Sequence, residues 1–343
     1  MDFRLTDDQR ALKRGVREVL ERRFPRDALR AALRAAADGD GGAGGVLDRK
    51  VWRELGAAGF FSLRLAEERG GAGLGLPEAV LLFEEAGRAL LPGPLVATHL
   101  AAGSVAGAAE GTTVVTAVDG GLVEWLDAAD VVLGDATGAV PMTSVDPLTP
   151  LHRVPGADPT SGPGMDTVPG PGVDTVFGPG AAGGGPTSGP GAGAGPASGP
   201  GAGPAPAPDR DLVSLLTAAE QLGSAARTTE AAVAYARTRT QFGQPIGGFQ
   251  AVKHLCAQML VRTEVARAAV YAAAVTADPV EIAGARLLAD EAAVGCARDC
   301  LQVHGGMGFT WEADVHLHLK RAWVRAERGL SGAAAEERVA AGL

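Results

Sequence analysis

The sequence YARTRTQFGQPIGGFQ, at residues 235–250, directly follows an alanine-rich stretch with a helical pattern. Two arginines, then Gln-Phe-Gly and Pro-Ile-Gly-Gly, interrupt that pattern, and the run is too polar and too broken to form simple core. Gly243 and Pro245 are residue types that commonly end a helix. We therefore predict a helix end and a turn here, shaped to hold a ligand.

Three long helical patterns make up the surrounding part of the chain, at residues 211–242, 249–275 and 280–303. The turns between them are short, which indicates an antiparallel helical bundle. A second broken sequence, LQVHGGMGFTWE at residues 301–312, follows the third helix. Both broken sequences are therefore expected at loops or helix ends of the bundle.

The remainder of the chain divides into parts of different composition. Residues 1–110 have the pattern of helices joined by short loops, and Thr6 and Gln9 have the spacing of a capping box. Residues 111–154 contain short β-branched runs, between 112 and 135, that indicate a few strands. Residues 155–208 are dominated by Gly, Pro, Ala, Ser and Thr, with too few large apolar side chains to offset the entropy of ordering. We predict a disordered linker there and a C-terminal helical domain at 209–343.

Composition excludes several classes of function. The formal net charge of −9 argues against nucleic-acid binding, which normally needs a basic surface. No apolar run approaches the length of a membrane span, and the charged start of the chain lacks the apolar stretch of a signal peptide. Three cysteines suit a reducing compartment better than a disulfide framework. We expect a cytoplasmic protein.

The two broken sequences together resemble the C-terminal helical domain of acyl-CoA dehydrogenases. Their order and their separation of about fifty residues carry the resemblance. The opening MDFRLTDDQRALKRGVREVL and the phrase EEAGRALLPGPL are similar to the N-terminal helical domain of that family. The resemblance covers most of residues 1–110 and 209–325. It implies a mainly α fold, with N-terminal and C-terminal helical domains and a reduced middle β segment.

The resemblance also implies an FAD site shared between subunits. It assigns Arg239 to the diphosphate of an FAD held mainly by a neighbouring subunit, Gln241 to a hydrogen bond, and Phe242 to packing against the adenosine half. An arginine suits a diphosphate because its guanidinium is always charged and can bond two oxygens at once. A site shared in this way implies an oligomer.

The second broken sequence is assigned to the adenosine end of the same cofactor. The resemblance implies that the backbone approaches FAD closely at Gly305 and Gly306, and that Gln302 supplies a polar contact. His304 could be a weak cofactor neighbour or only a loop residue. In the alternative interpretation of both sequences, Arg and Gly are present for capping and helix-dipole reasons alone.

A metal site is geometrically conceivable where Cys296 and Cys300 share a helical face with His304 one turn further on. A fourth ligand is not evident, and buried cysteine is common packing material. We therefore predict no metal.

A catalytic base is missing from both positions that the family uses. Dehydrogenation of an acyl thioester needs a carboxylate opposite the flavin, preferably in a dry pocket that raises its pKa. An ungapped match puts Gly329 at the usual position, with Glu327 two residues away, and Val213 at the alternative one. Glu220, two helical turns past Val213 on the same face, becomes the candidate base. The alternative is a glutamate paired or solvated on a helix surface.

Another acidic residue of the bundle, Glu264, is expected to form a salt bridge with Arg267, three residues on.

The departures from the family pattern indicate a heteromer. Without the usual middle domain, FAD lacks contacts to its isoalloxazine, which suggests that a partner supplies them. The chain is similar to small, divergent actinobacterial members that act on steroid side-chain or other bulky acyl-CoA thioesters, commonly as two unlike subunits. We expect FAD-dependent α,β-dehydrogenation of an acyl-CoA, with a second acyl-CoA dehydrogenase subunit and an electron-transfer flavoprotein or similar acceptor as partners. Two alternatives are a non-catalytic subunit that completes its partner's FAD site and a cofactor-free scaffold.

Overall fold

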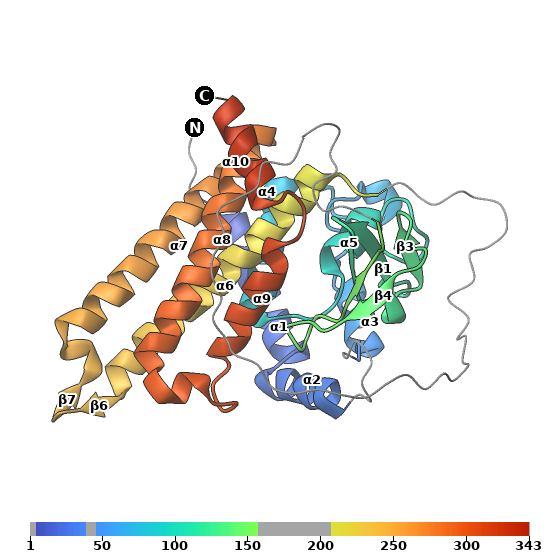
Figure 1. The fold of residues 1–343 in the computed structure, drawn as a ribbon. Helices are drawn as coiled ribbons and strands as arrows, with labels where there is room; N and C mark the ends of the chain where they lie inside the picture. The colour runs from blue at the N-terminus through green and yellow to red at the C-terminus, as the bar shows by residue number, and fades with distance from the viewer. Residues whose placement is uncertain (1–4, 39–45, 157–206, 343) are drawn as a thin grey trace.

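The computed structural model describes residues 5–38, 46–156 and 207–342. In the chain order a small β-sheet separates two groups of helices, and in space it lies beside them, at the right of Figure 1. This arrangement confirms the predicted mainly α fold with a small middle β segment. Most of the predicted linker, residues 157–206, lies outside the described residues. The domain boundaries therefore stay predictions.

The N-terminal helices begin at the predicted capping box. Thr6 accepts a hydrogen bond from the backbone of Gln9, and the Gln9 side chain accepts one from the backbone of Thr6. Satisfying these free N–H groups fixes the start of the first helix. The described N-terminal α-helices are α1 (Asp7–Arg23), α2 (Arg26–Asp38), α3 (Arg49–Ala57), α4 (Leu76–Ala89) and α5 (Leu95–Ala101).

A five-stranded sheet of order β3-β1-β2-β5-β4 forms the middle segment. Its strands are β1 (Val115–Asp119), β2 (Leu122–Glu124), β3 (Val131–Leu133), β4 (Val140–Met142) and β5 (Leu151–Arg153). Only β1 and β3 pair in parallel. The expected strand region ended at residue 135, so β4 and β5 were missed. Three-residue strands are too short to show an alternating pattern.

The C-terminal part is a bundle of long helices, as predicted (Figure 1). It contains α6 (Arg210–Thr238), α7 (Gln250–Thr276), α8 (Pro279–His304), α9 (Val315–Ala326) and α10 (Gly332–Ala341), with the short hairpin β6 (Thr240–Gln241) and β7 (Gln244–Pro245) between α6 and α7. Among the described helices, none is long and apolar enough to cross a membrane.

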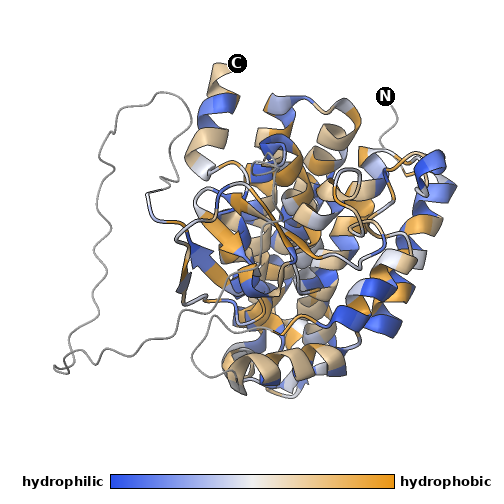
Figure 2. Ribbon diagram, turned by 90° about the vertical axis from the view of Figure 1, so that its right-hand side faces the viewer, coloured by the Kyte–Doolittle hydropathy of each residue, from blue (hydrophilic) through white to orange (hydrophobic). Residues whose placement is uncertain are grey.

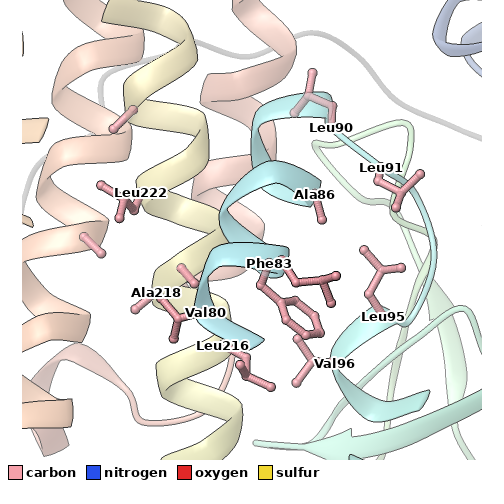
Figure 3. Packing of buried hydrophobic residues seen from close by; sticks show 14 of the residues in the cluster. Val80, Phe83, Ala86, Leu90, Leu91, Leu95, Val96, Leu216, Ala218 and Leu222 are labelled. Atoms are coloured by element: carbon pink, nitrogen blue, oxygen red, sulfur yellow. The ribbon is translucent and has the colours of Figure 1, made fainter. Parts of the chain in front are cut away.

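One hydrophobic core joins the two groups of helices. Val80 and Phe83 of α4 lie near Leu216 of α6 in Figure 3, and Leu222 extends the core on the other side of α6. Orange and blue segments alternate along the helices at the surface in Figure 2, as expected for amphipathic helices with one face in the core.

The contact between α4 and α6 depends on two glycines. A Cβ added at Gly87 would overlap the backbone carbonyl of Glu220, and one at Gly223 would overlap the carbonyl of Glu84. The helix backbones therefore meet without intervening side chains. This close contact places Glu220 directly against α4.

A buried polar cluster ties α1 and α4 to α7. Glu84 is 3% exposed and bonds Lys13 at 2.6 Å, the Tyr271 hydroxyl at 2.7 Å and Arg267. Burial alone would raise the pKa of the Glu84 carboxyl, but the two cations together hold it below its usual value. The expected pair of Glu264 and Arg267 is present as well, at 3.3 Å.

Acid is expected to destabilise the fold through His99 of α5. This side chain is 4% exposed, and its Nδ1 lies 3.2 Å from the Phe60 carbonyl oxygen. Burial lowers the pKa of His99 from 6.5 to about 4, so the unfolded chain binds the extra proton between these values. Stability from this group is complete above pH 6.5 and is lost as the pH falls toward 4. Between pH 7 and 5 we expect a loss of about 2 kcal/mol.

Urea unfolding at pH 7 and at pH 5 measures this loss, with the His99→Gln variant as the comparison. Glutamine does not titrate, so the variant is expected to lose about 2 kcal/mol less between the two pH values than the original chain. Equal losses in the two proteins would show that His99 does not carry the effect.

Candidate functional site

The turn predicted within residues 235–250 lies at the far end of the bundle (Figure 1). Helix α6 ends at Thr238, and the Ile246 N–H donates to the Arg239 carbonyl at 2.8 Å to close the hairpin. Phe242 and Gly243 at its tip both have positive φ, +53° and +79°. Only glycine adopts this region freely, so the hairpin holds Phe242 in a conformation that local preference alone disfavours.

The three side chains predicted to bind FAD here all face outward. Arg239 and Gln241 are exposed, and neither side chain has a hydrogen-bond or ion-pair partner among the described residues. Phe242 is 91% exposed, and its ring meets the Phe249 ring edge to face, with 6.1 Å between the ring centroids. An unpaired guanidinium beside an exposed aromatic ring matches a diphosphate and an adjoining apolar group on another molecule.

The second predicted sequence lies at the end of α8. Gln302, Gly305 and Gly306 are exposed, and Gly305 has φ +58° and ψ −141°, a conformation open only to glycine. A Cβ added at Gly305 or Gly306 meets nothing within 4 Å, so the backbone faces open space. A ligand can therefore approach this backbone closely.

A stacked pair of rings joins the two sequences. Tyr235 of α6 and His304 of α8 have ring centroids 4.1 Å apart, with 20° between the planes. His304 Nδ1 also lies 2.8 Å from the Cys300 carbonyl oxygen. These contacts hold the end of α8 against α6. The predicted FAD residues on the two helices thus share one end of the bundle, and His304 lies between them.

The two cysteines of α8 are packed in the core. Cys296 and Cys300 are both fully buried, and burial raises the pKa of the Cys300 thiol to about 12. A neutral thiol is a poor metal ligand and a poor nucleophile. In the described parts of the chain, no group of three His, Cys, Asp or Glu side chains is gathered for a metal ion.

Glu220, the candidate base, is enclosed rather than open to a cleft. It is 6% exposed, and its Oε1 accepts a hydrogen bond from Arg325 Nη2 at 2.8 Å. Burial raises the pKa of Glu220, whereas the charge of Arg325 opposes that rise. The cavity beside it has a volume of about 20 Å³. That space holds about one water molecule and no acyl chain.

A row of arginines on and after α9 fills the surrounding space. Arg321, Arg325 and Arg328 reach acidic residues of three other segments: Arg321 pairs with Asp146, Arg325 with Glu220, and Arg328 with Asp119 at 3.1 Å and Glu124 at 3.3 Å. This network joins the sheet to α6 and α9. The network was not predicted, although the spacing of the arginines, four and then three residues, places them on one helical face.

The two positions that the family resemblance gives to the base cannot present a carboxylate. Gly329 has φ +67°, and a Cβ there would overlap the Ser214 side chain. Val213 is 5% exposed and lines the same small cavity as Glu220. Side chains and backbone of this chain thus fill the space around both positions.

Comparison with known proteins identifies the family. Residues 6–113 match the acyl-CoA dehydrogenase N-terminal domain, and residues 214–335 match the acyl-CoA dehydrogenase C-terminal domain. Acyl-CoA dehydrogenase IpdE2 of Mycobacterium tuberculosis is 33% identical over 331 residues, which cover 90% of this chain and 89% of that protein.

Two solved structures share the fold. The ChsE4-ChsE5 complex from Mycobacterium tuberculosis has a chain with a TM-score of 0.74 and 22% identity, over 99% of this chain and 98% of that one. The Tcur3481-Tcur3483 steroid ACAD variant has a chain with a TM-score of 0.71 and 20% identity, over 98% of this chain and 97% of that one. The matches to both helical domains and the 33% identity to IpdE2 show that the chain belongs to the acyl-CoA dehydrogenase family.

Proposed function

We propose that this chain is one subunit of a heteromeric, FAD-dependent acyl-CoA dehydrogenase and completes an FAD site whose base belongs to the second subunit. One contrast carries the proposal. The residues suited to FAD are exposed at one end of the bundle, whereas the candidate base is buried in an ion pair beside a cavity of about 20 Å³. Ligand pockets for molecules of substrate size measure about 300 Å³ or more.

The exposed end suits the diphosphate and adenosine half of FAD. Arg239 would bind the diphosphate through paired hydrogen bonds, with Gln241 beside it and Phe242 against the adenosine. The open backbone at Gly305 and Gly306 would admit the adenosine end, near Gln302. When bound, FAD supplies the hydride acceptor for dehydrogenation of an acyl-CoA.

The similar structures support the heteromeric part of the proposal. One structure is named as the ChsE4-ChsE5 complex, and the other is named as the Tcur3481-Tcur3483 steroid ACAD, after two proteins. We extend both features to this chain: a second subunit of the same family, and a bulky, steroid-like acyl-CoA as substrate. An electron-transfer flavoprotein or a similar acceptor would reoxidise the flavin.

A second candidate function keeps Glu220 as the catalytic base of this chain. The observation in its favour is that burial raises the pKa of Glu220, as a base for an activated carbon requires. This function would need Arg325 to swing away and open a substrate space.

Glu220→Gln in the assembled complex separates the two candidates. Glutamine retains an acceptor for Arg325, so we expect unchanged FAD content and a kcat within about threefold of the original complex. Loss of a general base would instead lower kcat by about 100-fold or more. Steady-state turnover with an acyl-CoA and an artificial electron acceptor measures the difference.

A double variant controls for damage to the ion pair. Glu220→Leu together with Arg325→Met removes both charges, which avoids a buried unpaired ion. Turnover in this variant as well would support a structural role for the pair. Inactive but intact and flavin-loaded complexes of both variants would favour Glu220 as the base.

A further inference from the structure

Two cavities adjoin each other. The first lies between the α1–α2 junction and helices α4, α6 and α9, and the second lies between α6, the end of α8 and the start of α9. Their volumes are about 330 and 400 Å³, and they share the lining residues Arg26, Arg227, Asp314 and His318. Glu220 lines neither of them. They are therefore separate from the closed region beside Glu220, and each is large enough for a small organic molecule.

The first cavity has a wall of apolar side chains. These come from α1, the turn after it, α2 and the end of α4: Leu20, Phe24, Leu29 and Leu90. All four are at least 91% buried, so the wall is a continuation of the core. Such a wall gains free energy by covering the apolar part of a ligand.

A buried histidine lies at the junction of the two cavities. His318 is 6% exposed, and its Nδ1 lies 2.8 Å from Ser224 Oγ. Its other ring nitrogen, Nε2, has no hydrogen-bond partner among the residues described. When Ser224 donates to Nδ1, the Nε2 carries the ring proton and can donate to an acceptor in the cavity. Burial lowers the pKa of His318 to about 3, which keeps the ring neutral.

Arg227 is the cation of this site that lacks a carboxylate partner in the described parts of the chain. Arg17 pairs with Glu85, Arg26 with Asp314 and Arg88 with Glu230. Arg227 lines both cavities and is exposed. The arginines Arg227, Arg325, Arg321 and Arg88 add to the effect of burial in lowering the pKa of His318. Carboxylates line the two cavities as well: Glu21, Glu85, Glu312 and Asp314.

We propose that this site binds an organic carboxylate with an apolar body, such as a free medium-chain acyl carboxylate. The carboxylate lies between the Arg227 guanidinium and His318 Nε2, and the apolar body lies along the wall formed by α1, α2 and α4. A charged hydrogen-bond partner fixes the head group, and burial of apolar surface supplies most of the remaining affinity. The first cavity is lined by none of the residues assigned to FAD, whereas the second is also lined by Tyr235 and His304, beside the proposed FAD site.

Isothermal titration of the full chain, in its assembled form, with octanoate tests the proposal. Octanol has the same apolar chain without the negative charge, and inorganic phosphate has negative charge without an apolar chain. We expect octanoate to bind and both other probes to bind at least tenfold more weakly. Arg227→Gln should weaken octanoate binding by about tenfold or more. Arg298→Gln, at an exposed arginine of α8 that lines neither cavity, should not.

Three results would overturn the proposal: no heat of binding with octanoate, octanol binding as tightly as octanoate, or equal octanoate affinity in Arg227→Gln and Arg298→Gln. Tighter binding of phosphate than of octanoate would also overturn it, because it would assign the site to inorganic anions. Both variants change exposed side chains, so thermal unfolding of each is expected to match that of the original chain.

Discussion

Replacing Arg239 by glutamine is expected to remove most of the FAD from the assembled enzyme. The Arg239 guanidinium is exposed and unpaired among the described residues. The hydrogen bond from the Ile246 N–H to the Arg239 carbonyl fixes the backbone of this residue at the hairpin. Glutamine has the polarity but neither the charge nor the forked donors that match a diphosphate. We expect the Kd for FAD to rise about 10- to 100-fold, measured by fluorescence titration of the apo complex.

Arg237→Gln is the matched control for this experiment. Arg237 is also exposed and lies in the last turn of α6, only two residues earlier, but it is not among the residues assigned to FAD. Its replacement removes the same charge from the same helix end. Equal loss of FAD in the two variants would mean that general electrostatics, and not a specific diphosphate contact, accounts for the binding.

Replacing Gly223 by alanine is expected to destabilise the fold by about 3 kcal/mol. The added Cβ would overlap the Glu84 carbonyl oxygen and come within 2.8 Å of the Arg88 nitrogen, and backbone atoms cannot rotate away as side chains can. Helices α4 and α6 would have to separate along a core that is otherwise closely packed (Figure 3). Urea unfolding monitored by circular dichroism measures the change.

Gly15→Ala provides the comparison, because Gly15 lies inside α1 and a Cβ there meets nothing within 4 Å. This change should stabilise the chain by up to about 1 kcal/mol through helix propensity alone. A Gly223→Ala protein as stable as Gly15→Ala would show that α4 and α6 are not in close backbone contact.

Local signals in the sequence were sufficient for the helices and for placing the two broken sequences at helix ends. The capping box at Thr6 and Gln9 and the long bundle helices all depend on residues close together in the chain. The family resemblance then related two sequences that lie about fifty residues apart. The stack of Tyr235 on His304 explains how both reach one end of the bundle.

The hairpin at the end of α6 was not predicted. The helical pattern was extended to Phe242 because alanine and arginine favour helix up to that point, whereas α6 ends at Thr238. Hydrogen bonds between strands β6 and β7 replace the last helical turn. Such a competition between two local structures depends on pairing across the turn, which single-residue preferences do not report.

The enclosure of Glu220 was also not predicted, because it depends on contacts between residues far apart in the sequence. Arg325 lies 105 residues after Glu220, and Arg328 lies 209 residues after Asp119. Helical spacing alone placed Glu220 on the face of small and apolar residues, a position that suits either a base in a cleft or a buried ion pair. Only the tertiary contacts separate these two arrangements.

The visible absorbance spectrum tests the central claim most directly. The chain would be purified alone and again together with a second acyl-CoA dehydrogenase subunit, under identical conditions. The account predicts flavin absorbance only in the co-purified sample, and its loss when this chain carries Arg239→Gln. Flavin bound by this chain alone would contradict a site completed by two subunits, and a colourless complex would contradict any role in binding FAD.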